Sequence, residues 1–364
     1  MSKRLLRYLD WPLLGAMLAL MAGGVLVLYS AVHNTPNPAE FVRARVLHII
    51  MALIVLGLLA AVDYQAIARV WRSILAGTVL ALLAVLVIGR VSFGAQRWIG
   101  LGPLAAFQPA ELAKLALIIT LAKHIDGYKE FDSWRALLPV LAHAALPLAL
   151  IARQPDLGTA LVVAAILAAM IFVAQLPVRM LAALGAGAAT VAPLAWRLLH
   201  DYQRHRLLVF LDPNADPLGG GYALIQSKIA VGSGQLLGKG LLHGTQSLLH
   251  FIPEQHTDFI FTVVGEEFGF VGACVLLGLF ALWLWRAMTI AAQAKDRLGT
   301  LMAVGVVAMV GFHLVVNVGM TVGLMPITGI PLPWVSHGGS ALITMAGATG
   351  LLLSIGMRRK KILF

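Results

Sequence analysis

The 364-residue sequence predicts an all-α fold, a polytopic membrane bundle of about ten transmembrane helices. Three observations predict it. Hydrophobic residues make up 60% of the chain and charged residues only 12%, against about 25% in a typical soluble domain. The apolar stretches are continuous over about 20 residues, the length with which a helix crosses a bilayer. Barrel strands would alternate apolar and polar residues over about ten positions, so helices are predicted.

The predicted spans follow the apolar stretches in chain order. The first has no clear small-residue cleavage site and is long enough to span, so we expect it to be a retained helix and not a signal peptide. The fourth is the least apolar, since it contains Glu111 and Lys114. The predicted spans are residues 11–31, 46–62, 72–88, 110–124, 136–151, 157–176, 180–199, 259–285, 300–325 and 340–356.

Positive charge is concentrated on one side of this predicted bundle. An even number of spans places both termini on the same side, and sixteen Lys and Arg residues lie in the tails and connections there, against five in the short connections of the other side. Because cytoplasmic connections carry the excess of Lys and Arg, both termini are predicted to be cytoplasmic. The net charge of +11 is thereby explained as an orientation signal, and no nucleic-acid partner is expected.

One long connection, residues 200–257, lies between the seventh and eighth predicted helices and is extracytoplasmic in this orientation. It is rich in Gly and Pro, and a connection of this length is usually functional or disordered. Residues 222–231 have a helix-like pattern that suits the membrane interface. Residues 232–240 superficially resemble a phosphate-binding loop, but Ser233 and Gly240 break the required pattern, so nucleotide binding is not expected. We treat residues 1–364 as a single membrane domain.

Ionisable residues in or beside the spans are the candidate functional residues, because charge is expensive there. Glu111 and Lys114 lie three apart on one helical face and can pair. They are either a structural ion pair that lets both charges enter the membrane, or a cation facing a cavity that receives an anionic group. Just upstream, Arg97 precedes Trp98, whose side chain is a candidate interfacial anchor.

Two further carboxylates precede predicted helices. Asp156 precedes the sixth helix and Asp258 the eighth, where a carboxylate can cap the exposed N–H groups. Glu254, His256 and Asp258, however, bring three titratable groups within five residues. Neighbouring carboxylates raise one another's pKa, as general acid–base chemistry requires, and the same three groups could bind a divalent cation.

The segment 317–340 contains three prolines and several glycines at membrane depth. Irregular backbone is tolerated there only where it is buried in protein or lines a watery cavity. An ordinary kinked connection is the alternative to a cavity, and we favour the cavity. The residues alone therefore indicate a membrane enzyme or transporter that acts near the outer leaflet.

These segments, in this order, resemble the SEDS family (the RodA and FtsW proteins) of peptidoglycan glycosyltransferases. The resemblance rests on residues 94–114, 153–161, 210–269 and 317–342 and so spans most of the chain. The short tails are more similar to the RodA branch, which acts in elongation and cell shape, than to the FtsW branch, which acts in division. Two positions depart from the family's pattern, namely Gln255, where Ala is frequent, and His337, where Tyr is usual.

The resemblance implies polymerisation of lipid II into β-1,4-linked glycan strands at the bacterial inner membrane, with the site facing the periplasm and a class B penicillin-binding protein as partner. Asp258 aligns with the family's essential carboxylate, which implies a general base for one inverting displacement. Lys114, Arg97 or a divalent cation (Mg²⁺ or Mn²⁺) near Asp258 would neutralise the leaving diphosphate, and no other cofactor is expected. The other implied substrate-binding residues are Glu111, Asp156, Glu254, His256, Thr257, Ser336, Gly338 and Gly339.

Two other functions remain open. A lipid II flippase would also suit ten helices and a polar cavity, although no internal repeat is visible and the polar groups gather on one face. A non-catalytic scaffold for the penicillin-binding protein is the second. Lipid II scrambling without polymer would favour the flippase, and retained function of Asp258→Ala in cells would favour the scaffold.

Overall fold

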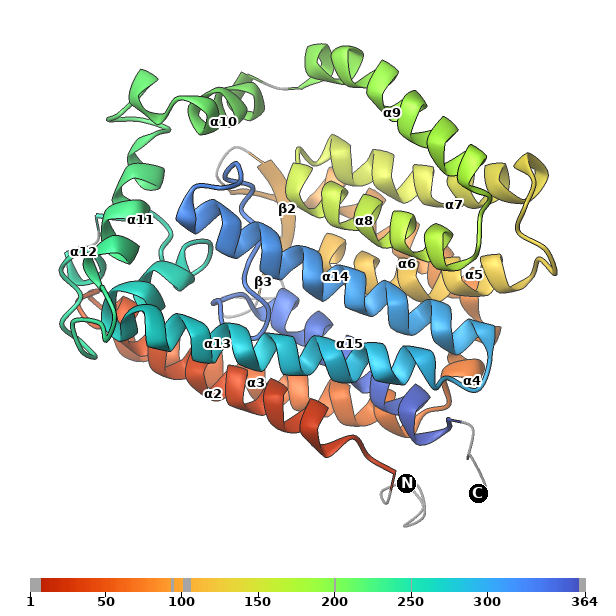
Figure 1. The fold of residues 1–364 in the computed structure, drawn as a ribbon, viewed down its shortest axis with the longest axis horizontal. Coiled ribbons are helices and arrows are strands. Elements are labelled where there is room, and N and C mark those ends of the chain that lie inside the picture. Colours follow the sequence, from red (N-terminus) through yellow and green to blue (C-terminus); the bar gives the residue numbers. More distant parts are fainter. Residues whose placement is uncertain (1–7, 93–94, 101–105, 200, 250, 360–364) are drawn as a thin grey trace.

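The computed structural model describes residues 8–92, 95–100, 106–199, 201–249 and 251–359. Helices dominate it, and each of the ten predicted spans corresponds to one helix (Figure 1). The multi-pass helical membrane fold is confirmed. The ten helices are α2 (Trp11–Val32), α3 (Pro38–Ala61), α5 (Trp71–Ile88), α6 (Pro109–Asp126), α7 (Trp134–Arg153), α8 (Leu157–Val173), α9 (Val178–Leu198), α13 (Ile260–Ala292), α14 (Arg297–Val322) and α15 (Gly339–Met357).

Within the part of the chain that the structure describes, seven of these helices are long and apolar enough to cross a membrane. Helix α8, with 17 residues, and the described stretch Val178–Val191 of α9 are shorter apolar helices. Two boundaries were predicted wrongly. Helix α3 begins at Pro38, because a proline is well suited to the first helical turn, and α13 continues to Ala292. Helix α6 is less apolar than the others of these ten helices because it contains the charged residues Glu111, Lys114, Lys123 and Asp126, together with His124.

The centre of the bundle is formed by α14 and α15. In α15, 89% of the apolar stretch is buried, and in α14 61%. Helix α15 packs against α3, α14 packs against α6, α8 and α13, and α13 packs against α2. Most described side chains of α9, by contrast, are exposed, and α9 lies at the outer edge of the bundle (Figure 1).

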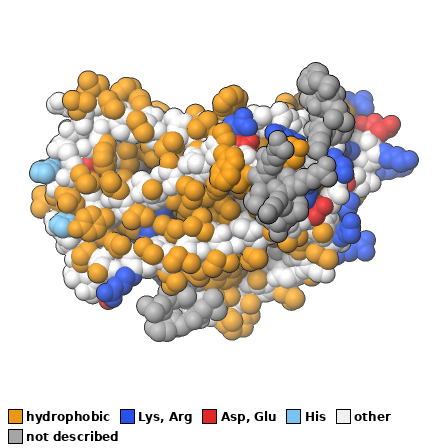
Figure 2. All heavy atoms as spheres, turned by 90° about the horizontal axis from the view of Figure 1, so that it is seen from below, with side chains coloured by type: hydrophobic (Ala, Val, Ile, Leu, Met, Phe, Trp, Pro, Cys, Tyr) orange, Lys and Arg blue, Asp and Glu red, His pale blue; other side chains and the backbone are white. Residues whose placement is uncertain are grey.

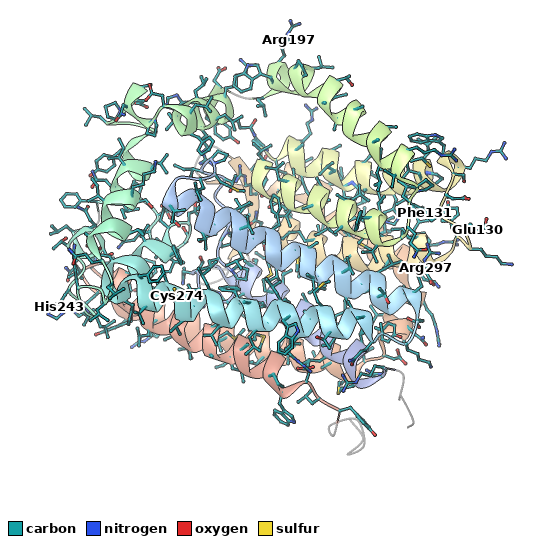
Figure 3. The ribbon with its side chains drawn as sticks, viewed as in Figure 1. Glu130, Phe131, Arg197, His243, Cys274 and Arg297 are labelled. Atoms are coloured by element: carbon teal, nitrogen blue, oxygen red, sulfur yellow. The ribbon has the colours of Figure 1, made fainter. Side chains whose placement is uncertain are left out.

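The outer surface has the distribution expected of a protein in lipid. Figure 2 shows hydrophobic side chains spread over one broad face, with Lys and Arg gathered toward one end. Figure 3 places Arg297 at that end and His243 at the opposite end. Arg297 joins two connections there, because it donates to the carbonyl oxygens of Tyr128 at 2.7 Å and Ala174 at 3.3 Å.

A small antiparallel sheet lies between α5 and α6, where no strand was predicted. Its strands are β1 (Arg90–Ser92), β2 (Ala95–Gly100) and β3 (Ala106–Phe107), in the order β1-β2-β3. Strands this short produce no extended alternation in the sequence. The sheet matters for the site because β2 carries Arg97.

The long connection between α9 and α13 contains helices. They are α10 (Asp201–Leu211), a 3-10 turn at Pro213–Ala215, α11 (Tyr222–Ser233) and α12 (Thr245–Leu248). Helix α11 confirms the helical pattern expected at 222–231, whereas α10 was not predicted. In Figure 1 these elements lie at the end of the bundle opposite α4 (Tyr64–Arg69).

Helix α13 is interrupted at Gly269, whose φ is 62°. The backbone groups exposed by this break are satisfied by the segment 235–240. The N–H of Lys239 donates to the carbonyl of Glu266 at 3.0 Å, and the N–H of Phe270 donates to the carbonyl of Gln235 at 2.9 Å. The glycine-rich segment that superficially resembled a phosphate-binding loop thus pairs with broken helix backbone, which must be satisfied by protein at membrane depth.

The two carboxylates beside this break anchor the same connection. Glu266 accepts from Lys239 Nζ at 2.8 Å and from the hydroxyl of Ser247 at 2.7 Å. Glu267 accepts from the hydroxyl of Ser30 on α2 at 2.5 Å. Both carboxylates are therefore committed to structural contacts.

Candidate active site

Asp258 lies two residues before α13, at the end of a turn that begins at Glu254. Glu254 has a φ of 50°, a left-handed conformation that is uncommon outside glycine. Its carbonyl accepts from the N–H groups of Thr257 at 3.1 Å and Asp258 at 3.0 Å, and from the Thr257 hydroxyl at 3.1 Å. Local hydrogen bonds therefore fix the backbone of Asp258 before the helix begins.

The two carboxylates that precede helices have different roles. Asp156 caps α8, since its Oδ1 accepts from the N–H of Thr159 at 3.1 Å, and its Oδ2 accepts from Gln108 Nε2 at 2.9 Å. The N-cap of α13, by contrast, is Phe259, with no side-chain cap. The capping interpretation is confirmed for Asp156 and wrong for Asp258, whose carboxyl is left for another role. Substrate binding by Asp156 stays a prediction.

The Asp258 carboxyl faces Gly329 and neighbours Arg206. A Cβ at Gly329 would lie 3.3 Å from Asp258 Oδ2 and 4.0 Å from Arg206 Nη1, so both charged groups approach the same small residue. Gly329 has a φ of 73°, which also favours glycine. Arg206 comes from α10 and donates to the carbonyl of Ile327 at 3.5 Å. The sequence had not marked Arg206 as a candidate.

Burial raises the pKa of Asp258 to about 6. The hydrogen bond from Thr257 and the positive charges of Arg206 and Arg97 oppose this rise, while Glu254 adds to it. At neutral pH the carboxylate is therefore mostly deprotonated and still a better proton acceptor than an ordinary aspartate. These are the properties of a general base.

A pocket lies beside Arg206, although Asp258 itself is not among the residues that line it. Two guanidinium groups, Arg97 and Arg206, line it together with Tyr202 and apolar side chains of α8 and α10. Arg97 is held by the turn between α7 and α8, because its Nε donates to the carbonyl of Gln154 at 3.0 Å and its Nη2 to that of Pro155. Positive charge beside an apolar wall suits an anionic group attached to a hydrocarbon chain. The other lining residues are Pro155, Leu157, Leu161, Gln203, Leu207, Pro326, Ile327 and Thr328.

Glu111 and Lys114 pair as their spacing predicted, with Lys114 Nζ 2.7 Å from Glu111 Oε1. Lys114 is completely buried, and its Nζ is also 2.9 Å from Nε2 of His313 on α14. Neither Glu111 nor Lys114 lines the pocket with Arg97. The substrate-binding roles of Glu111 and Lys114 stay predictions.

His256 and Glu254 lie on the side of the turn that meets the segment before α15. The His256 ring packs edge-on against Phe41 of α3, with centroids 5.3 Å apart, and lies 5.8 Å from the ring of His337. Glu254 Oε2 lies 4.0 Å from His256 Nε2. The N–H of His337 donates to the carbonyl of His256 at 2.9 Å, so the turn is tied to residues 334–339.

Ser336, Gly338 and Gly339 belong to this second segment. The Ser336 hydroxyl accepts from the N–H of Leu332 at 2.8 Å, and its carbonyl accepts from the buried Arg45 at 2.6 Å. Gly338 is the N-cap of α15, and Gly339 begins that helix. The contacts of Ser336 are structural, and the substrate-binding roles of these three residues stay predictions.

Among the described residues, no group of three or more His, Cys, Asp or Glu side chains could hold a metal ion. Arg206 and Arg97 already place positive charge near Asp258. The described side chains therefore do not fit a metal site made by protein alone. A divalent cation beside Asp258 stays a prediction.

The fold and the site define a polytopic membrane enzyme with a basic carboxylate and a cationic pocket at one end of the bundle. Residues 11–361 match the model of the FtsW/RodA/SpoVE family, described as cell cycle protein, and the chain belongs to this family. It is the SEDS family whose motifs the sequence contains.

Named relatives of this chain are consistent with its membership of this family. Peptidoglycan glycosyltransferase MrdB of Escherichia coli K12 is 40% identical over 355 residues, which cover 97% of this chain and 95% of the relative. Peptidoglycan glycosyltransferase RodA of Treponema pallidum is 35% identical over 425 residues, covering 96% and 98%. The expected class of enzyme, a peptidoglycan glycosyltransferase, is thereby confirmed.

Two solved structures share the fold. A chain from a peptidoglycan synthase complex, studied for the structural coordination of polymerization and crosslinking, aligns with a TM-score of 0.82 at 37% identity, covering 96% of this chain and 98% of that chain. The rod shape determining protein RodA of Thermus thermophilus aligns with a TM-score of 0.72 at 32% identity, covering 97% and 98%. The similarity therefore extends over nearly the whole bundle.

Proposed function

We propose that this chain polymerises lipid II into β-1,4-linked glycan strands, with Asp258 as the general base. The observation that carries the proposal is the position of the Asp258 carboxyl, which lies against Gly329 beside Arg206 and has a pKa of about 6 because of burial. A base is most effective when its pKa lies near the working pH.

The reaction needs one displacement. The acceptor's 4-hydroxyl attacks the anomeric carbon of a sugar that is α-linked to undecaprenyl diphosphate. The new bond joins the acceptor O4 to that carbon with inversion, and the bond from that carbon to the diphosphate oxygen breaks. Asp258 takes the hydroxyl proton, and the diphosphate leaves with the electron pair. A positioned base typically contributes about 10²–10⁴ in rate.

Arg97 and Arg206 are the proposed partners of the diphosphate. Both line the pocket, and guanidinium groups bind phosphate oxygens through paired hydrogen bonds. Leu157, Leu161 and Leu207 form an apolar wall of the same pocket, which suits the polyprenyl chain. The two guanidinium charges and the apolar wall of this pocket support the arrangement.

The proposed location is the bacterial inner membrane, with the site on the periplasmic side. The end of the bundle that carries α4 is the end where Lys and Arg gather, as expected of a cytoplasmic face, and α10 to α12 lie at the other end (Figures 1 and 2). A class B penicillin-binding protein is the proposed partner, supported by similarity to a chain of a peptidoglycan synthase complex. The names of the relatives MrdB and RodA favour elongation.

The test is polymerisation by the purified full-length protein, reconstituted with its partner and lipid II. Asp258→Asn keeps the shape of the side chain and removes its basicity, so we expect the rate to fall about 100-fold or more. Asp216→Asn is the matched control, because Asp216 is a carboxylate of the same connection whose oxygens contact His205 and accept from the N–H groups of Gly219 and Gly220. Unchanged melting temperature and partner binding would show that both variants are folded.

The outcome also separates the alternatives. Normal polymerisation by Asp258→Asn would refute Asp258 as the base. Scrambling of lipid II in liposomes by the wild-type protein, with no polymer formed, would favour the flippase. Normal cell shape with Asp258→Asn as the sole copy would favour the scaffold.

A further inference from the structure

We infer that Lys114 and His313 are positioning residues, which hold the segment 329–331 against Asp258 without contacting the substrate. The inference rests on the proposed function, since it concerns the same carboxylate. It assigns Lys114 a role other than neutralising the diphosphate.

Lys114 does not line the pocket in this structure. Its side chain is 0% exposed, and its Nζ lies between Glu111 Oε1, at 2.7 Å, and His313 Nε2, at 2.9 Å. Glu111 is also buried. A buried lysine needs such a counter-charge, because an unpaired charge in the membrane interior is expensive. The cations that do line the pocket are Arg97 and Arg206.

The contact with Lys114 determines which nitrogen of His313 carries the hydrogen. An ammonium group has only donors, so His313 Nε2 must accept from it. The hydrogen of the neutral imidazole is therefore on Nδ1, which lies 3.0 Å from the carbonyl oxygen of Pro331 and donates to it. Lys114 thus selects the tautomer that can hold the Pro331 carbonyl.

The Pro331 carbonyl belongs to the segment that faces Asp258. Asn317, one helical turn after His313 on the same face of α14, donates from Nδ2 to the carbonyl of Ile330 at 2.8 Å and to that of Asp258 at 2.8 Å. Gly329 directly precedes Ile330 and lies against the carboxyl. A Cβ placed on Gly329 would be 3.3 Å from Asp258 Oδ2. One face of α14 therefore holds the base and the segment that confines it, and Lys114 acts on this face through His313.

Two amide substitutions separate the two contacts of His313. In His313→Asn the amide nitrogen can replace Nδ1 as the donor to Pro331, but the contact with Lys114 is lost. In His313→Gln the longer side chain can accept from Lys114, but the donor to Pro331 is lost. Both variants are neutral amides in the same buried position, so they form a matched pair. The assay is lipid II polymerisation by the full-length protein with its partner, with kcat and KM measured across pH.

We expect His313→Asn to retain a kcat within about threefold of wild type and His313→Gln to lose about tenfold or more, as for a lost buried hydrogen bond. The acid limb of the His313→Gln profile should move to lower pH, because a loosened segment admits water to the Asp258 carboxyl. Lys114→Met should lower kcat and leave the KM for lipid II unchanged. Melting temperature and partner binding identify folded protein, and only folded variants are compared.

Three results would overturn the inference. The first is an equal loss of kcat in the two His313 variants, and the second is wild-type activity in His313→Gln. The third is a raised KM with unchanged kcat in Lys114→Met, which would indicate that Lys114 binds the substrate directly. Failure of the proposed function is a different result, because the wild-type protein itself would then make no polymer.

Discussion

The side-chain amide of Asn317 donates a 2.8 Å hydrogen bond to the backbone carbonyl of Asp258. The same nitrogen donates to the carbonyl of Ile330 at 2.8 Å, so one buried residue of α14 joins the turn before α13 to the segment after α14. The position of Asp258 therefore depends on α14, where Asn317 lies 59 residues further along the chain, and on the segment that follows α14.

Removing this amide should misplace the base. Asn317→Ala leaves two buried carbonyl groups without their donor, and each such loss costs about 1–3 kcal/mol. We expect a lower melting temperature and a polymerisation rate reduced about tenfold or more. Val315→Ala, at an exposed position of the same helix, is the control and should change neither quantity appreciably. Wild-type activity in Asn317→Ala would show that the hydrogen bond does not position Asp258.

The rate should depend on the protonation of Asp258. Its pKa of about 6 lies above the ordinary value, so the carboxyl is protonated and inactive below about pH 6 and deprotonated above it. We expect kcat/KM for lipid II to rise with pH through about 6 and then level off. A rate that is flat between about pH 5 and about pH 7 would contradict this assignment, since that range spans the pKa of about 6.

Arg206 should set where that rise occurs. Its positive charge lowers the pKa of Asp258, so Arg206→Gln should raise that pKa and move the acid limb to higher pH. Arg204→Gln is the matched control, because Arg204 lies on the same helix but pairs with Asp201. If both variants leave the limb in place, the Arg206 guanidinium does not act on the carboxylate.

Gly329 should tolerate no side chain. Gly329→Ala would place a Cβ 3.3 Å from Asp258 Oδ2 at a residue with φ of 73°, a conformation that costs an L-residue about 1–2 kcal/mol. We expect a lower kcat together with a lower melting temperature. Gly23→Ala in α2, where a Cβ meets nothing within 4 Å, should leave both unchanged or slightly improved. Full activity in Gly329→Ala would mean that the segment does not confine Asp258.

The break in α13 should be equally sensitive to a side chain. A Cβ at Gly269 would clash with the backbone nitrogen of Gly238, and its φ of 62° disfavours other residues. Gly269→Ala should therefore lower the melting temperature markedly, with a cost above about 2 kcal/mol. Gly278→Ala lies in the same helix with open space around it and serves as the control. Equal melting temperatures for the two variants would contradict this account of the break.

Spacing within one helix predicted one ion pair correctly. Glu111 and Lys114 pair because residues three apart share a helical face. Their third partner, His313, lies 199 residues further along the chain, and no local pattern indicates it. Arg206 was overlooked for the same reason, since α10 brings it to the pocket only through the folded connection between α9 and α13.

The sequence by itself determined the membrane class, the approximate positions of the ten helices and most of the candidate residues, because hydrophobicity, helical spacing and motif order are local properties of the chain. Only the tertiary structure decided what each candidate does. Asp156 and Asp258 both precede a helix, yet Asp156 caps its helix and Asp258 does not. Burial raises the pKa of Asp258, the charge of Arg206 limits that rise, and Gly329 lies against the carboxyl; these groups come from segments that meet only when the bundle folds.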